Sequence, residues 1–189
     1  MFGLLRHRKH ELRRALAVLT TGLALSWSDW CALAQGDWRF LLSGGPQAPA
    51  IVHGPSQAAA AASLRDALEP VVGRALEVVP DEQVMAPNSW RLREEWAQRD
   101  LIVLGDIEHN RALFALFSQF FEGVNTAWPG PGRYILRTLF APFRRGANLL
   151  VVGAGDEAGL TVGIARLVAL AREAAPDAPG VRALPPLLE

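Results

Sequence analysis

Four polar residues directly follow an apolar run and form the densest group of chemically useful side chains in this sequence. The run is 101–104 (LIVL), and the group is Asp106, Glu108, His109 and Asn110. Asp106 or Glu108 could act with His109 as general acid and base, and open sheets bind ligands beyond the carboxyl ends of their strands. Asp106 could equally cap the next helix, and Asn110 could tie down the loop. The pattern favours capping and leaves ligand contact and catalysis open.

Two further sequence features could contact a carbohydrate. Trp128 stands in a loop stiffened by Pro129 and Pro131, where an exposed indole could stack on a sugar ring. Alternatively, Trp128 packs over the sheet edge or against a neighbouring domain, and the pattern favours this structural role. Arg144 and Arg145 could clamp the carboxylate of an acidic sugar, although solvated turn charges are the commoner use of such a pair.

Few metal ligands or thiols remain beyond residue 34. Cys31 is the only cysteine of the chain, and His53 and His109 are the only histidines after it. A thiolate site and a zinc site built from several histidines are therefore excluded in that part. No nucleophile elbow, zincin motif, P-loop or EF-hand occurs, so we expect no metal and assign no catalytic residue.

Three glycines between a strand and a helix resemble a dinucleotide-binding loop. Gly153, Gly155 and Gly159 are spaced G-x-G-x-x-x-G, but a dinucleotide loop opens a β-α-β unit, with an acidic residue after its second strand. Here we predict a single helix after the loop. The glycines are better explained by a tight turn and close packing of helix on sheet, and we expect no cofactor.

The overall charge gives no sign of a nucleic-acid partner. The chain has 189 residues, half of them apolar, with 19 basic and 19 acidic side chains. This composition is typical of one globular domain with or without a tail. A domain that binds nucleic acid would be expected to carry a basic stripe.

The amino-terminal segment 1–34 has the composition of a secretory signal peptide. A basic region is followed by a short apolar run and by Ala32-Leu33-Ala34, which fits a cleavage site. We therefore expect export to the periplasm or the extracellular space. An uncleaved segment would instead be a membrane anchor, and Arg13-Arg14 leaves twin-arginine export open beside the general secretory route.

The remaining chain reads as an exposed lead-in (35–49), an α/β domain (50–175) and a Pro-rich tail or linker (176–189). Strands and helices alternate in the order β-α-β-β-α-β-β-α, which predicts an α/β (α+β) fold with a central mixed sheet of about five strands and about three packed helices. We expect strands at 50–53, 75–79, 101–104, 133–140 and 147–152, and helices from Ser56, over 109–121 and from Asp156 to before Pro176.

Three details of these helices are specific enough to test. Pro70 either ends the first long helix near Leu68 or lies in its final turn, with Gly73 as a left-handed cap. The periodicity of helix 109–121 places Leu113, Leu116 or Phe117, and Phe120 or Phe121 on its apolar stripe. A short helix over 90–98 would turn Trp90 and Trp96 inward.

Several motifs together resemble a known domain. They are the A-x-x-L helix and following strand (Ala59 to Val79), the turn at Gly105, Asp106 and Asn110, the segment Pro129, Gly130, Gly132 and Tyr134, the strand Asn148 to Gly153, and the helix entry at Asp156, Gly159 and Gly163. This pattern resembles the non-catalytic N-terminal α/β domain of secreted glycoside hydrolases, as in β-N-acetylhexosaminidases and α-glucuronidases. It covers about residues 50–174.

The resemblance implies an exported accessory domain that packs against a catalytic domain, in cis or in trans, expected downstream of this chain. It transfers no catalytic acid pair to this sequence. Two alternatives stay open. One is a free-standing binding module for a carbohydrate or another small ligand, with a cleft formed by the loops 105–110, 123–132 and 153–156. The other is a small hydrolase using Asp106, Glu108 and His109.

Overall fold

The structure is a computed structural model that describes residues 39–45, 48–144 and 146–188. The chain divides into two units, Met1–Trp38 and Arg39–Glu189, and all described residues belong to the second. The predicted signal peptide, 1–34, lies outside the described residues. Within them, no helix has the length and apolar character needed to cross a membrane.

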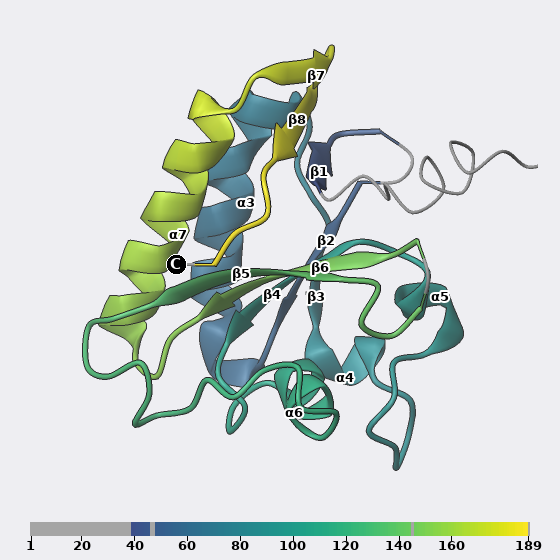
Figure 1. Cartoon of the computed structure of the whole chain (residues 1–189), viewed down its shortest axis with the longest axis vertical. Coiled ribbons are helices and arrows are strands. Elements are labelled where there is room, and N and C mark those ends of the chain that lie inside the picture. Colours follow the sequence, from purple (N-terminus) through teal and green to yellow (C-terminus); the bar gives the residue numbers. More distant parts are fainter. Residues whose placement is uncertain (1–38, 46–47, 145, 189) are drawn as a thin grey trace, which may run out of the picture. The chain divides into compact units, whose positions relative to one another are not determined.

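A five-stranded sheet forms the centre of the second unit (Figure 1). Its strands lie in the order β3-β2-β4-β6-β5. Strands β3, β2, β4 and β6 are parallel, whereas β5 runs antiparallel to β6. The bounds are β2 Ala50–His53, β3 Val78–Pro80, β4 Leu101–Gly105, β5 Ile135–Phe140 and β6 Asn148–Gly153.

Helices cover both faces of this sheet, which explains why its central strands are continuously apolar. Helices α3 (Ala58–Val72) and α7 (Glu157–Glu173) lie side by side on one face, and α6 (Arg111–Phe117) lies on the other (Figure 1). Alternate residues of β4 serve the two faces: Ile102 and Leu104 pack with α3 and α7, and Leu101 and Val103 pack with α6. All five residues of β4 are buried.

Shorter helical turns complete the main connections. They are η1 (Pro55–Gln57), α4 (Asp81–Val84) and α5 (Glu94–Ala97). The predicted fold class, with its mixed five-stranded sheet and three main helices, is confirmed. Helix α3 continues through Pro70 to Val72, and Gly73 closes it with φ +79° and an N–H donated to the Glu69 carbonyl. Pro70 therefore lies in the final turn of the helix, with Gly73 as its left-handed cap, and does not end the helix near Leu68.

Helix α6 is shorter than predicted, and this changes the environment of its aromatic residues. The periodicity predicts a helix over 109–121, but α6 ends at Phe117. Phe117, Phe120 and Phe121 are exposed rather than packed on a buried stripe. The short helix expected over 90–98 is reduced to α5, and Trp90 lies outside it with an exposed ring, whereas Trp96 is partly buried.

The expected lead-in and tail are not loose segments, because they pair with each other. Strands β1 (Phe40–Ser43), β7 (Pro176–Ala178) and β8 (Val181–Leu184) form an antiparallel sheet in the order β1-β8-β7. Phe40 and Leu42 from one end, and Leu184 and Leu187 from the other, are buried in the core beside α3 and α7. Phe40 and Leu42, in the lead-in that was predicted to be exposed, are therefore buried, and the described part of the predicted Pro-rich tail, 176–188, contributes two strands and Leu187 to the domain.

We predict that Leu187 stabilises the fold although it follows two prolines near the end of the chain. Leu187 is 6% exposed, and its neighbour Leu188 is 83% exposed. Leu187→Ala should lower the free energy of unfolding by about 2–3 kcal/mol, since it removes buried methyl groups and leaves a cavity. Leu188→Ala is the matched control and should change it by less than about 0.5 kcal/mol. Equal effects in urea unfolding would contradict the docked tail.

Candidate functional site

A cleft of about 250 Å³ lies at the carboxyl edge of the parallel strands. Loops that follow β2, β4 and β6, three neighbouring strands, line it. The chain leaves β2 toward α3 on one face and leaves β4 toward α6 on the other, so the strand order reverses between them. Crevices at such reversal points are where open α/β sheets bind ligands. The lining includes Ser56, Gln57, Gly105, Asp106, His109, Ala154, Gly155, Asp156 and Glu157.

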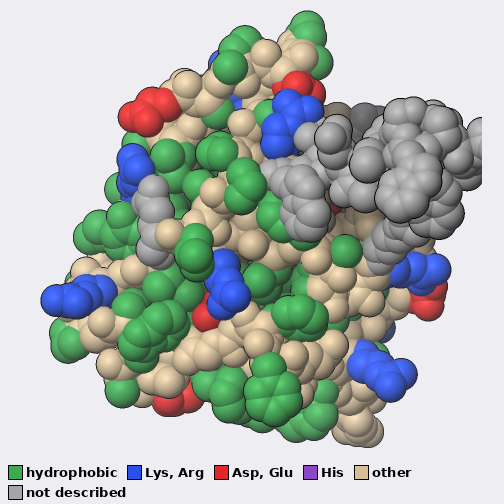
Figure 2. Space-filling model, in the orientation of Figure 1, with side chains coloured by type: hydrophobic (Ala, Val, Ile, Leu, Met, Phe, Trp, Pro, Cys, Tyr) green, Lys and Arg blue, Asp and Glu red, His purple; other side chains and the backbone are tan. Residues whose placement is uncertain are grey.

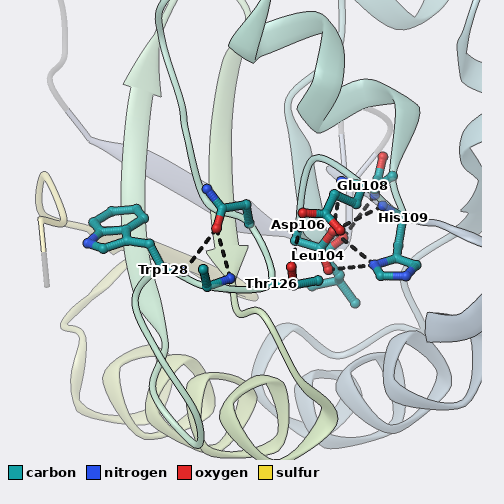
Figure 3. A network of polar contacts seen from close by, with 9 residues as sticks. Leu104, Asp106, Glu108, His109, Thr126 and Trp128 are labelled. Carbon is teal, nitrogen blue, oxygen red and sulfur yellow. Dashed lines mark hydrogen bonds and ion pairs between the residues drawn. The ribbon is translucent and has the colours of Figure 1, made fainter.

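Asp106 and His109 form a hydrogen-bonded pair in this cleft (Figure 3). The buried Asp106 carboxylate accepts hydrogen bonds from the backbone N–H groups of Glu108 and His109, at 2.7 and 3.0 Å. The His109 Nδ1 lies 2.9 and 2.8 Å from its two oxygens. This contact fixes the ring and assigns the proton of the neutral imidazole to Nδ1. Nε2 is then an acceptor without a hydrogen bond among the described residues.

Asn110 is a structural residue. Its side chain is buried, and Oδ1 accepts the N–H of Ala112 at 2.9 Å, which caps α6. Nδ2 donates to the carbonyls of Leu104, at 2.9 Å, and Val52, at 3.4 Å, and so joins the ends of β4 and β2. The amide groups are thus satisfied by the fold itself, in agreement with the structural alternative for this residue.

Two glycines allow the loops after β2 and β4 to approach closely. A Cβ on Gly54 would lie 1.7 Å from the His109 carbonyl oxygen, so a side chain is excluded there. Gly105 has φ +99°, and its Cβ position lies 3.0 Å from the Gln57 amide. Gln57 is 9% exposed, and its Oε1 has no hydrogen-bond partner. Gln57 was not among the residues predicted from the sequence, and its position shortly after the carboxyl end of β2 was the available signal.

Asp156 holds the third loop of the cleft. Oδ1 accepts the Gly159 N–H at 2.7 Å and caps α7, as predicted, and Oδ2 accepts the Gly132 N–H at 2.8 Å. These two bonds lower the pKa of the Asp156 carboxyl below its usual value. A Cβ on Gly159 would lie 2.1 Å from the Arg133 carbonyl oxygen. The glycines of this loop therefore serve close packing, as the sequence favoured.

The loop 123–132 lies beside the cleft without lining it. Thr126 donates to the Glu108 carboxylate at 3.0 Å, and Asn125 Oδ1 accepts the N–H groups of Ala127 and Trp128. The Trp128 ring is 51% exposed and stands apart from the Asp106–His109 pair (Figure 3). The prediction that the loops 105–110, 123–132 and 153–156 form the cleft is therefore corrected. The loop after β2 lines the cleft in place of the loop 123–132.

The predicted arginine clamp is not part of this site. Arg144 forms an ion pair with Glu94 and lines a separate hollow with Trp90. Arg145 lies outside the described residues. Of the residues singled out from the sequence, the cleft thus brings together Asp106 and His109, with Asn110 directly behind them, and leaves Trp128 and Arg144 elsewhere.

The cleft combines the Asp106–His109 pair with further polar side chains. Within the described ranges, no group of three or more metal-ligating side chains comes together. Ser56 lines the cleft but makes no hydrogen bond to His109, so the Asp106–His109 pair has no bound nucleophile to activate. Glu108 is turned to Thr126 rather than to the cleft. Nothing in this arrangement favours the hydrolase alternative over ligand contact.

Comparisons with known proteins add no family to this picture. No protein-family model matches the sequence, and a search of curated proteins finds no match. The geometry of the described residues is therefore the basis for a functional argument.

We predict that Asn110 cannot be replaced by a residue that only caps the helix. Aspartate is as good an N-cap as asparagine, but it cannot donate to the carbonyls of Leu104 and Val52. Asn110→Asp should therefore lower the free energy of unfolding by about 2 kcal/mol, measured by urea unfolding at neutral pH. Asn110→Ala is the comparison. If Asn110→Asp retained the stability of the unchanged chain, capping alone would explain the residue.

We also predict an acid-sensitive contribution from Asp156. Its folded-state pKa lies below the unfolded value, so its stabilisation is present above about pH 4 and is lost as the pH falls through the folded value. The stability difference between the unchanged chain and Asp156→Asn should shrink on acidification below that pH. Asp100 has the opposite sign, because burial raises its pKa, and it is common to both proteins. A difference independent of pH would contradict the assignment.

Proposed function

We propose that this chain is an exported accessory domain of a carbohydrate-active enzyme, and that an aromatic cluster at α6 packs against the catalytic domain. The resemblance to the N-terminal domains of secreted glycoside hydrolases and the signal-peptide composition of residues 1–34 support the export and the enzyme class. The cluster supports the docking role. It consists of Trp90, Phe114, Phe117, Phe120 and Phe121.

In the α6 aromatic cluster, the rings of Trp90, Phe114 and Phe117 lie in a row, and Phe120 and Phe121 follow in the turn after α6. The Trp90 and Phe114 rings have centroids 4.5 Å apart, and Phe114 and Phe117 are 5.9 Å apart. Trp90 is 55% exposed, and Phe117, Phe120 and Phe121 are also exposed. Figure 2 shows hydrophobic side chains gathered over α6 at the lower edge of the view. Contiguous exposed surface of this kind marks interaction sites on soluble domains.

The rings of the cluster suit a protein surface better than a sugar. A sugar stacks on the open face of a flat ring, whereas Trp90 is tilted by 44° to Phe114 and Phe114 by 53° to Phe117. Tilted rings cover part of one another's faces and present edges and crevices. Such a relief is complemented by apolar side chains of a partner domain.

The strongest support for the docking role is the conformation and exposure of Phe120. The Phe120 and Phe121 N–H groups bond to the carbonyls of Phe117 and Leu116, at 2.9 and 3.0 Å, which is the pairing of a Schellman turn. Phe120 occupies the left-handed position of this turn, with φ +62°, where glycine is usual. Its side chain is 98% exposed. A bulky residue in a strained conformation that contributes no packing to the fold is explained by a contact with another molecule.

We predict that Phe120→Gly stabilises the chain while weakening docking. Removing the left-handed strain should raise the free energy of unfolding by up to about 1 kcal/mol. For docking, the locus that encodes this chain should be sequenced, and the catalytic domain in the same reading frame or an adjacent gene purified. Its Kd for the full chain should rise at least about tenfold with Phe120→Gly, as for a central interface aromatic, measured by calorimetry.

Val162→Ala is the matched control for this experiment. Val162 is an exposed apolar residue of α7, on the opposite face of the sheet, and its substitution should leave the Kd within about twofold. A locus without a carbohydrate-active catalytic domain would contradict the proposed class. An unchanged Kd with Phe120→Gly would contradict the proposed surface.

A further inference from the structure

We propose that the cleft between the loops after β2, β4 and β6 binds a neutral polyhydroxylated molecule of the size of one sugar unit. The α6 aromatic cluster shares no residue with the lining of this cleft. The two proposals therefore rest on different observations and are tested separately.

The size and position of the cleft favour a small ligand. A volume of about 250 Å³ equals about eight water molecules at about 30 Å³ each, which is room for one monosaccharide unit. Larger hollows, of about 610 to 740 Å³, are more open and lie away from the carboxyl ends of β2, β4 and β6. The cleft is thus the concave site at the reversal of strand order, where a small ligand meets three loops at once.

The side chains of the cleft are mainly acceptors. In the neutral imidazole of His109, Nδ1–H donates to Asp106 and Nε2 is the free acceptor. Gln57 Oε1 is buried and has no partner, which is costly for a polar atom unless a donor reaches it. The carboxylates of Asp156 and Glu157 lie in the same lining, which contains no lysine or arginine. A ligand for this site must donate hydrogen bonds and carry no negative charge.

The start of α3 lies beside these acceptors. Helix α3 begins after η1 without a side-chain cap, and its first-turn residues Ala59 and Ala60 line the cleft. A hydroxyl group donates one hydrogen bond and accepts others, so a polyol in the cleft can donate to His109 Nε2 beside the Gln57 side chain.

The remaining lining explains why the binding should be weak and selective for the neutral form. Ala60, Ala154 and Leu160 give a small apolar surface for the carbon atoms of a ring. An aromatic platform is missing from the lining, since Trp128 stands apart. Phosphate or a uronate would meet Asp106, Asp156 and Glu157 without a compensating cation, and like charges at close range repel.

The test is a titration of the full chain, labelled with ¹⁵N, with methyl glucoside, methyl xyloside and N-acetylglucosamine. Glucuronate and inorganic phosphate serve as charged probes, and a tetrasaccharide of glucose tests a chain end against a free sugar. We expect saturable shifts of the Gln57, Gly105 and Gly155 amides with at least one neutral sugar or with the chain end, at a Kd in the millimolar range. The charged probes should bind at least tenfold more weakly.

Variants assign this binding to the cleft. His109→Ala, at a half-exposed position, should raise the Kd more than fivefold, and Gln57→Met should do the same with similar side-chain volume. Glu108→Gln is the matched control: Glu108 lies in the same loop and points to Thr126, so the Kd should stay within twofold. Thermal unfolding checks that each variant is folded.

Three results would overturn the proposal. They are the lack of a saturable shift with every neutral probe, tighter binding of phosphate or glucuronate than of the neutral sugars, and a Kd that His109→Ala and Gln57→Met both leave unchanged. Each can occur whether or not the α6 aromatic cluster binds a catalytic domain.

Discussion

The fold depends on a buried amide that joins three elements. Asn110 accepts from the first turn of α6 and donates to the carbonyls at the ends of β4 and β2. Val52 is still paired with Val103 in the β2–β4 register, whereas Leu104 lies one residue beyond the last pair of these strands. Loss of the Asn110 donor would therefore remove the side-chain bond to the buried Leu104 carbonyl, at a cost of about 1–3 kcal/mol. One side chain thus sets where β2 and β4 end, where α6 begins and how the intervening loop is held.

The cleft follows from this constraint. Because the loop after β4 is fixed at Asn110, its earlier part must turn within a few residues, and Gly105 takes the positive φ that this turn requires. Gly54 then permits the His109 carbonyl to approach the loop after β2. The same close approach confines Gln57 and leaves its oxygen without a partner. A cavity and an unpaired acceptor are therefore consequences of how tightly two loops are tied together.

The helices and strands that were predicted correctly have signals within a few residues of sequence. The features that were not predicted depend mainly on contacts between segments far apart in the chain. The apolar run 101–104 identified β4 and Asp156 identified the start of α7, since each signal acts within a few residues. For the end of α3, the sequence left two positions open, near Leu68 and at Gly73, and the structure has the second. The pairing of β1 with β8 joins segments about 140 residues apart, and neither segment is stable alone. The helix predicted over 109–121 ends early because Phe120 has a left-handed backbone conformation. Phenylalanine rarely adopts this conformation, so its residue type gave no warning of the helix end. Gln57 could be predicted as a cleft residue only with the knowledge that β2 and β4 are neighbours in the sheet.

Helix α6 connects the two proposed surfaces. Its seven residues run from the Asn110 cap, directly behind the Asp106–His109 pair, to the turn that presents Phe120. At about 1.5 Å per residue, the two ends are about 10 Å apart. Leu113 and Leu116 anchor the helix in the core between these two ends. A partner bound at the exposed end of α6 that displaces this helix would also displace Asn110 and the loop that carries His109. By linkage, a ligand in the cleft would then change the binding free energy of that partner by the same amount as the partner changes that of the ligand.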